Sequence, residues 1–182
     1  MFSATPAAKW ATLVSAVLYI AYLLLALQAD AVDSGIVVQG GLTFAQAIAW
    51  SVALWQLRKL AVALRADPAI LRYVAILVTM VVATGLCWYP AQASGDNLLL
   101  ISLYFSLVAL TGIAYILLGA CLLRVPDAHR GLRLFAWMAV ASGMCMMVVV
   151  ALIVAVPFIL IAHGALWSLF RSYESTSSAA AE

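Results

Sequence analysis

Long apolar runs alternate with short polar breaks along almost the whole chain. A helix needs about 20 mostly apolar residues to cross a bilayer. Four runs come close to that length, and they predict membrane-spanning helices over Trp10 to Leu27, Leu42 to Leu57, Ile70 to Trp88 and Leu98 to Leu123. The breaks between them hold Asp, Gly, Pro and Asn, residues that favour turns. The pattern therefore predicts an all-α fold, a polytopic integral membrane helix bundle.

The last apolar stretch, Leu134 to Phe170, is too long for one crossing. As a single helix it would be about 55 Å long, against a hydrocarbon core of about 30 Å. It forms either two spans with a tight turn near residues 155–157 or one helix kinked at Pro157, so the bundle has six or five transmembrane helices. We favour six, because Arg171 then lies on the same side as the other basic residues.

The composition indicates that lipid surrounds this fold. The chain of 182 residues is 68% hydrophobic and 9% charged, whereas soluble domains are about 45–50% apolar and about 25% charged. We expect a single transmembrane helical domain over residues 1–171 and a short disordered C-terminal tail over residues 172–182, which are rich in Ser and Ala. The net charge of +2 gives no reason to expect a nucleic-acid partner.

The basic residues indicate which way the chain faces. Seven of the nine lie in two short stretches, residues 58–72 and 124–133, whereas the breaks with Asp30, Asp33 and Asp96 hold no cation. Lys and Arg close to the ends of spans stay on the cytoplasmic side. We therefore predict a multi-pass protein of a bacterial-type inner (plasma) membrane with a cytoplasmic N-terminus.

The first apolar run is followed by residues 29–31, Ala-Asp-Ala, which resemble a signal-peptidase site. A cleaved signal peptide is therefore an alternative to a first span. We expect the run to stay as a span, because the later spans need an orienting first helix.

Small residues recur at every fourth position of the second run, at Gly41, Ala45, Ala49 and Ala53. Such a stripe lets the backbone of another helix approach closely. We interpret it as a helix-contact face, either inside the bundle or between subunits. The expected partners are the lipid bilayer and other transmembrane helices, in a homo-oligomer or with a partner membrane subunit.

Hydroxyl-bearing side chains recur along one face of the first run and one face of the fourth. They are Ser15, Tyr19, Tyr22, Tyr104, Thr111 and Tyr115. A hydroxyl inside lipid must find a hydrogen-bond partner, so we expect both faces to look inward. They serve either as interhelical hydrogen-bonding groups or as a candidate polar path for a substrate.

His163 is the one ionisable side chain well inside an apolar run. Intramembrane ionisable residues are often functional, so it is a candidate haem ligand, metal ligand or proton relay. The alternative is a neutral imidazole that bonds a neighbouring helix, and a bis-histidine haem site lacks its second ligand because His129 lies in a basic turn. Met138 and Cys145 share a helix face and are candidate Cu(I) ligands, although embedded Met usually fills space. We predict no metal and no cofactor.

The motifs of common enzyme classes are missing from the sequence. There is no Gly-rich phosphate loop, no His-Glu-x-x-His, no Gly-x-Ser-x-Gly and no pair of intramembrane carboxylates. We therefore predict a protein that is not an enzyme. The leading hypothesis is an accessory or assembly subunit acting through helix–helix contacts. The second is a small oligomeric transporter or channel for a small solute, and the third is a haem- or copper-binding membrane protein.

Overall fold

The computed structural model describes residues 6–27, 33–64, 67–94, 97–126, 128–148 and 152–179. This part of the chain forms six helices and no strand: α1 (Pro6–Leu27), α2 (Asp33–Ala63), α3 (Pro68–Ala93), α4 (Leu98–Leu123), α5 (Arg130–Met147) and α6 (Leu152–Ala179). All of these helices except α5 are long and apolar enough to cross a membrane. The prediction of an all-α polytopic membrane bundle is confirmed.

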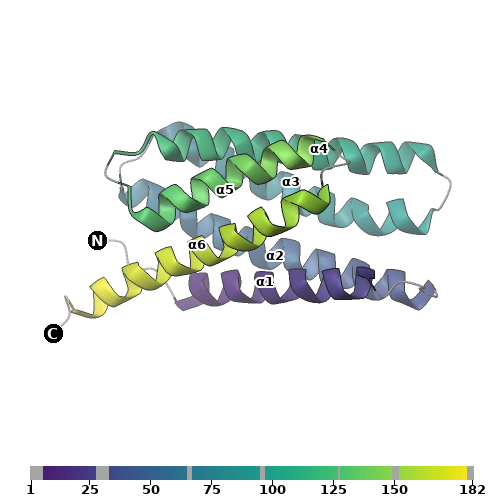
Figure 1. Ribbon diagram of the computed structural model, residues 1–182, viewed down its shortest axis with the longest axis horizontal. Coiled ribbons are helices and arrows are strands. Elements are labelled where there is room, and N and C mark those ends of the chain that lie inside the picture. The colour runs from purple at the N-terminus through teal and green to yellow at the C-terminus, as the bar shows by residue number, and fades with distance from the viewer. Residues whose placement is uncertain are drawn as a thin grey trace.

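The six helices run back and forth and close into a ring (Figure 1). Each helix packs against the next one in the chain, and α1 also packs against α6. At one end of the bundle α1 begins, α6 ends, α2 passes into α3 and α4 passes into α5 (Figure 1). We call this the basic end, because the described basic residues lie toward it: Lys9, Arg58, Lys59, Arg72, Arg124, Arg130, Arg133 and Arg171.

The opposite end is where α1 passes into α2 and α3 passes into α4 (Figure 1). Asp33 begins α2 there, while Asp30 and Asp96 lie outside the described residues. The described basic residues therefore gather at one end of the bundle, as the sequence predicts. Which end faces the cytoplasm stays a prediction.

Two Trp–Arg pairs mark the basic end. The guanidinium of Arg58 lies 4.5 Å from the centre of the Trp55 ring on α2, and that of Arg171 lies 5.3 Å from the centre of the Trp167 ring on α6. Tryptophan and arginine are both suited to the boundary between lipid and water, and each pair adds a cation–π attraction. The same kind of pair thus lies near the basic end on two helices that flank α1.

The turns at both ends use residues that start helices. Asp67 accepts a hydrogen bond from the backbone N–H of Ala69, and Pro68 takes the first position of α3. At the opposite end, Asn97 accepts from the N–H groups of Leu99 and Leu100 at the start of α4. Such side chains satisfy backbone donors that have no partner inside the helix. The two helices that follow these breaks therefore begin at local capping residues.

The last apolar stretch forms two helices, and its break lies between Met147 and Leu152. The predicted turn at residues 155–157 and the single helix kinked at Pro157 are both wrong, because Pro157 lies inside α6. Proline is tolerated in membrane helices where neighbouring groups satisfy the freed carbonyl. The chain leaves the helical conformation at Val148 (φ −102°, ψ 95°), the first of three β-branched valines, which are weak helix formers.

Two helix boundaries differ from those of the expected spans. α2 begins nine residues before Leu42, and α6 continues to Ala179, into the predicted tail, so where the transmembrane domain ends stays a prediction. α1 packs between α2 and α6, so cleavage after it would remove one wall of the ring. The residues of the signal-peptidase-like site lie outside the described part, and retention of α1 also stays a prediction.

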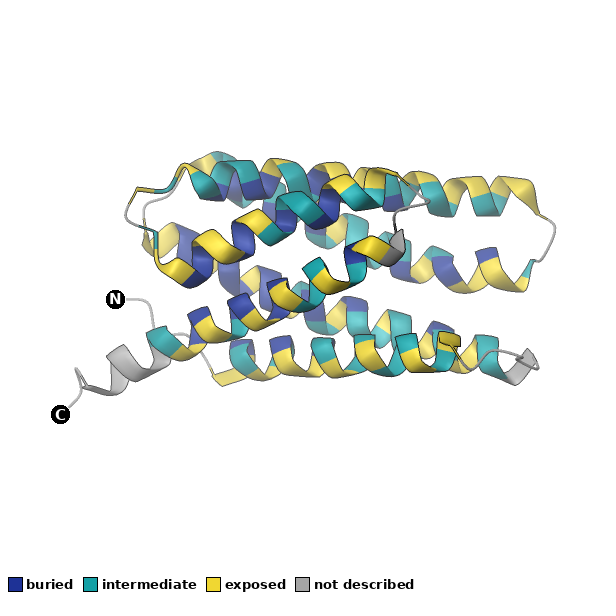
Figure 2. Ribbon diagram, viewed as in Figure 1, coloured by how far each residue is buried: buried dark blue, intermediate teal, exposed yellow. Residues whose placement is uncertain are grey.

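The half of the bundle nearer the basic end has a tightly packed apolar core. Its fully buried side chains are Leu54, Leu57, Leu60, Ile70, Leu77, Leu118, Leu122, Leu132, Phe135, Leu166, Leu169 and Phe170. Buried faces turn inward and exposed faces turn outward on every helix (Figure 2). Many of the exposed side chains are large and apolar, such as Trp10, Leu110 and Trp137. An apolar outer surface suits contact with lipid.

Glycines bring α4 and α5 into backbone contact. A Cβ atom on Gly112 would lie 2.7 Å from the carbonyl oxygen of Gly143, and one on Gly119 would lie 2.6 Å from that of Ala136. Small residues allow such close approach between membrane helices, where van der Waals packing drives association. This contact was not predicted from the sequence. The sequence feature that would have indicated it is a spacing of seven residues between small residues on both helices, from Gly112 to Gly119 and from Ala136 to Gly143.

Candidate functional site

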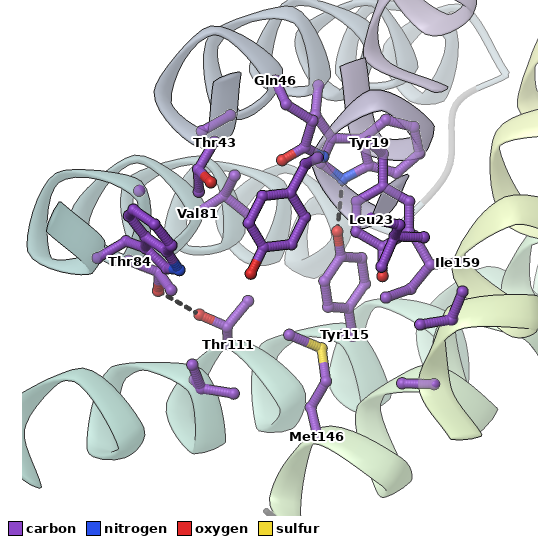
Figure 3. Close-up of a pocket in the computed structure, with 18 of the residues that line it drawn as sticks. Tyr19, Leu23, Thr43, Gln46, Val81, Thr84, Thr111, Tyr115, Met146 and Ile159 are labelled. Atoms are coloured by element: carbon purple, nitrogen blue, oxygen red, sulfur yellow. Dashed lines mark hydrogen bonds between the residues drawn. The ribbon is translucent and has the colours of Figure 1, made fainter. Parts of the chain in front are cut away.

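A cavity of about 340 Å³ occupies the half of the bundle away from the basic end (Figure 3). It is partly open, and every helix contributes to its wall. The polar and aromatic residues that line it are Tyr19, Tyr22, Thr43, Gln46, Trp50, Thr84, Trp88, Tyr104, Thr111, Tyr115 and His163, and Met146 lines it from α5.

The cavity begins where the packed core stops. On α2 the lining residues run from Thr43 to Trp50, and the buried leucines that follow belong to the core. On α6 the lining residues run from Ala155 to His163, and the core continues from Ala165. The bundle therefore has a solid half at the basic end and a hollow half at the opposite end.

Three side chains separate the two halves, and we call them the floor: Trp50, Tyr115 and His163. The indole N–H of Trp50 donates a hydrogen bond to the hydroxyl oxygen of Tyr115 (Figure 3). The imidazole of His163 stacks on the Trp50 ring, with centroids 4.0 Å apart and planes at 29°. The floor thus joins α2, α4 and α6 across the ring.

Both ring nitrogens of His163 have hydrogen-bond partners. Nδ1 lies 2.8 Å from the carbonyl oxygen of Ile159, and Nε2 lies 2.9 Å from Oγ of Ser15 on α1. A carbonyl oxygen can only accept, so Nδ1 carries a proton and donates to Ile159. Burial of this side chain disfavours a charge, so the neutral imidazole is favoured, and its Nε2 then accepts from the Ser15 hydroxyl of a neighbouring helix. A metal at Nε2 would have to displace Ser15.

The other candidate ligands lie apart from His163. His129 is exposed at the basic end, where its Nδ1 accepts from the backbone N–H of Gly131. Met138 packs against the core, and Cys145 is half-buried. Among the described residues, no three His, Cys, Asp or Glu side chains come together as metal ligands would. The absence of a bound metal or cofactor stays a prediction.

The two hydroxyl faces predicted from the sequence meet at this cavity. Five of their six residues line it: Tyr19, Tyr22, Tyr104, Thr111 and Tyr115. The sixth, Ser15, lies behind the floor and is fully buried against His163. Since α1 and α4 are not neighbours in the chain, their faces look at each other across the hollow of the ring. Whether the faces form a path for a substrate stays a prediction.

The contributions of α2 and α3 to the cavity wall were not predicted from the sequence. Thr43, Gln46 and Trp50 lie at i, i+3 and i+7 on α2, and Thr84 and Trp88 lie at i and i+4 on α3. The hydroxyl oxygens of Thr84 and Thr111 lie 3.2 Å apart, joining α3 to α4 (Figure 3). The same helical spacing that singled out α1 and α4 would have found these faces.

Among the described residues, no Asp, Glu, Lys or Arg side chain lines the cavity. Its polar groups are hydroxyls, the amide of Gln46, the indole N–H groups of Trp50 and Trp88, and the imidazole of His163. The site can therefore offer hydrogen bonds and aromatic contact, but it has no counter-ion for a charged ligand.

The small-residue stripe on α2 has one open end. A Cβ atom on Gly41 would meet nothing within 4 Å, while Ala45 and Ala49 are half-buried and Ala53 is fully buried. The stripe as a contact face stays a prediction, with room at Gly41 for lipid or for another chain.

No protein-family model, no curated protein and no solved structure matches this chain.

Proposed function

We propose that the protein binds a small, uncharged, lipid-soluble molecule in this cavity, as a carrier or receptor within the membrane. The observation that supports this most is the cavity itself, because all six helices line one space of about 340 Å³. Ligand pockets in proteins hold about 300–1,000 Å³ and combine apolar walls with a few polar groups. This is the small-solute hypothesis among the three drawn from the sequence.

The packed core supports a carrier or receptor over an open channel. Below the floor, the centre of the ring is filled by side chains such as Leu54, Leu118 and Leu166, each with no exposed area. A continuous pore would need these residues to move apart. The ligand would therefore enter and leave from the hollow half in this conformation.

The accessory-subunit hypothesis remains a second candidate, and the open end of the α2 stripe at Gly41 is the feature in its favour. We do not propose an enzyme. Ser15 and His163 are paired as a nucleophile and a base would be, but Ser15 has no exposed area and does not line the cavity. A substrate in the cavity would not reach its hydroxyl.

Filling the cavity is expected to abolish binding. Val108 is buried and lines the cavity from α4, whereas Leu110 on the same helix faces outward and is 48% exposed. In lipid nanodiscs, radiolabelled methylnaphthalene should bind wild type saturably, above protein-free nanodiscs. We expect Val108→Phe to weaken this binding at least tenfold, because the added ring takes the ligand's place.

The matched control is Leu110→Phe, which adds the same ring on the lipid-facing side. It should bind the probe as wild type does, and both variants should keep the wild-type melting temperature within a few degrees. The proposed site would be refuted if wild type showed no saturable binding, or if the two variants bound the probe equally well.

We also propose that the basic end faces the cytoplasm of a bacterial-type inner membrane, since cations near span ends stay inside. Asp67 and Asn97 cap helices at opposite ends of the bundle. In a background without the three native cysteines, Asp67→Cys should resist a membrane-impermeant thiol reagent in whole cells, and Asn97→Cys should react. The reverse labelling pattern would invert the topology.

A further inference from the structure

Resting on the proposed function, we infer the chemical class of the ligand. We propose that the cavity takes a flat, uncharged aromatic ring that carries carbonyl or hydroxyl groups at its edge, as in the head group of a lipid-soluble quinone or quinol. Three properties of the cavity support this choice: its aromatic walls, its lack of charge and the kinds of hydrogen bond that it offers.

Aromatic rings form much of the wall. His163 and Trp50 are stacked at the floor, and Tyr22 meets Trp88 edge to face with centroids 5.9 Å apart. Tyr19 lies parallel to His163 at 6.4 Å. Aromatic side chains favour stacked or edge-to-face contact with another ring. A flat ring can thus meet both faces and edges of its neighbours, which a globular aliphatic molecule cannot do.

The size of the space suits one such ring system. A volume of about 340 Å³ is about what eleven water molecules occupy in the liquid, at about 30 Å³ each. That is room for one substituted bicyclic ring and too little for a whole phospholipid. Because the cavity is partly open, an attached hydrocarbon chain would extend out of it into the lipid.

The tyrosines supply hydrogen-bond donors. Within the described part of the chain, the hydroxyls of Tyr19, Tyr22 and Tyr104 line the cavity and have no hydrogen-bond partner. Tyr115 accepts from Trp50 and keeps its own proton to donate. Polar groups inside proteins rarely stay unpaired. Carbonyl oxygens on a ligand would satisfy these phenols.

The threonines supply acceptors. Thr43, Thr84 and Thr111 each donate to the backbone carbonyl four residues earlier in their own helix. One of the protons of Thr84 and Thr111 can instead join these two hydroxyls, whose oxygens lie 3.2 Å apart. In either arrangement the threonine protons are engaged, and the remaining lone pairs can accept a hydrogen bond from a ligand hydroxyl. Donors and acceptors therefore face the same space. A quinone can accept from the phenols, and its quinol can also donate to the threonines.

The test compares three probes of similar shape on the wild-type protein in nanodiscs: menadione, methylnaphthalene and naphthalene sulfonate. A hydrogen bond typically strengthens binding about twofold to tenfold. We expect menadione to bind at least tenfold more tightly than methylnaphthalene, because it adds two carbonyl acceptors. The sulfonate should not bind saturably, because the cavity has no counter-ion.

A pair of tyrosine variants identifies the donors. Tyr104 lines the cavity, whereas Tyr89 is 45% exposed on α3 and does not line it. Tyr104→Phe should weaken menadione binding about threefold to tenfold and leave methylnaphthalene unchanged, since only the hydroxyl is removed. Tyr89→Phe should change neither affinity.

Each contrary result has its own meaning. Equal affinities for menadione and methylnaphthalene, with no effect of Tyr104→Phe, would overturn the ligand class while cavity binding stands. Preference for the sulfonate would also overturn it, because a charged ligand would then be the right one. Failure of every probe to bind saturably would refute the ligand class and the proposed function together.

Discussion

Gly143→Ala is expected to lower the free energy of unfolding by about 1–3 kcal/mol, the cost of overpacking a tight contact. The new methyl group would collide with the carbonyl oxygen of Gly112 on α4, and it would also lie 2.9 Å from a side-chain carbon of Ile116. A backbone carbonyl cannot turn aside as a side-chain tip can. The variant must therefore move α4 and α5 apart, which loosens the closest contact in the ring.

The matched control is Gly41→Ala, also in a membrane helix. A Cβ atom there would meet nothing within 4 Å, so the change removes only the poor helix propensity of glycine, worth up to about 1 kcal/mol in favour of alanine. Unfolding in mixed detergent micelles should show opposite signs for the two variants. Equal effects on unfolding would mean that α4 and α5 are not in backbone contact.

His163→Ala is expected to destabilise the protein by about 2–3 kcal/mol without removing any bound cofactor. Hydrogen bonds between membrane helices average about 0.6 kcal/mol, and an aromatic stack adds about 0.5–1.5 kcal/mol. The variant loses the bond to Ser15 and the stack on Trp50. It also leaves a void beneath the floor, which adds a cost of its own.

A double-mutant cycle separates these terms. Ser15→Ala removes only the hydroxyl that donates to Nε2, so we expect it to cost about 0.6 kcal/mol. Adding Ser15→Ala to the His163→Ala variant should lower the free energy of unfolding almost no further, because the hydrogen bond is already gone. An absorption spectrum and metal analysis of wild type provide the second readout. Stoichiometric haem or copper that disappears with His163 would promote the cofactor hypothesis above the proposed one.

The helical spacing of the hydroxyl-bearing residues was enough to predict which faces of α1 and α4 look inward. Tyr19 and Tyr22 share one face of a helix, and Tyr104, Thr111 and Tyr115 share another, and all five line the cavity. The positions of the turns also follow from local chemistry, since Asp67 and Asn97 each bond backbone groups two or three residues away. Such properties depend on residues within a few turns of one another.

The break in the last apolar stretch could not be located in the same way. Pro157 is the strongest local breaker there, yet it lies inside α6, and α5 ends before Val148, a residue that resembles the rest of the stretch. In lipid, a helix can keep a proline where its neighbours compensate. The position of the turn therefore depends on how α5 and α6 pack against the other helices.

By itself the sequence determined an all-α membrane bundle, the gathering of its described basic residues at one end and the polar faces of α1 and α4, because hydrophobicity and helical spacing are written locally. Only the tertiary structure decided that Ser15 bonds His163 across 148 positions and that Trp50 bonds Tyr115 across 65. It also decided that one half of the ring is solid and the other hollow. These features depend on which helices are neighbours and how each is rotated, and packing among all six sets both.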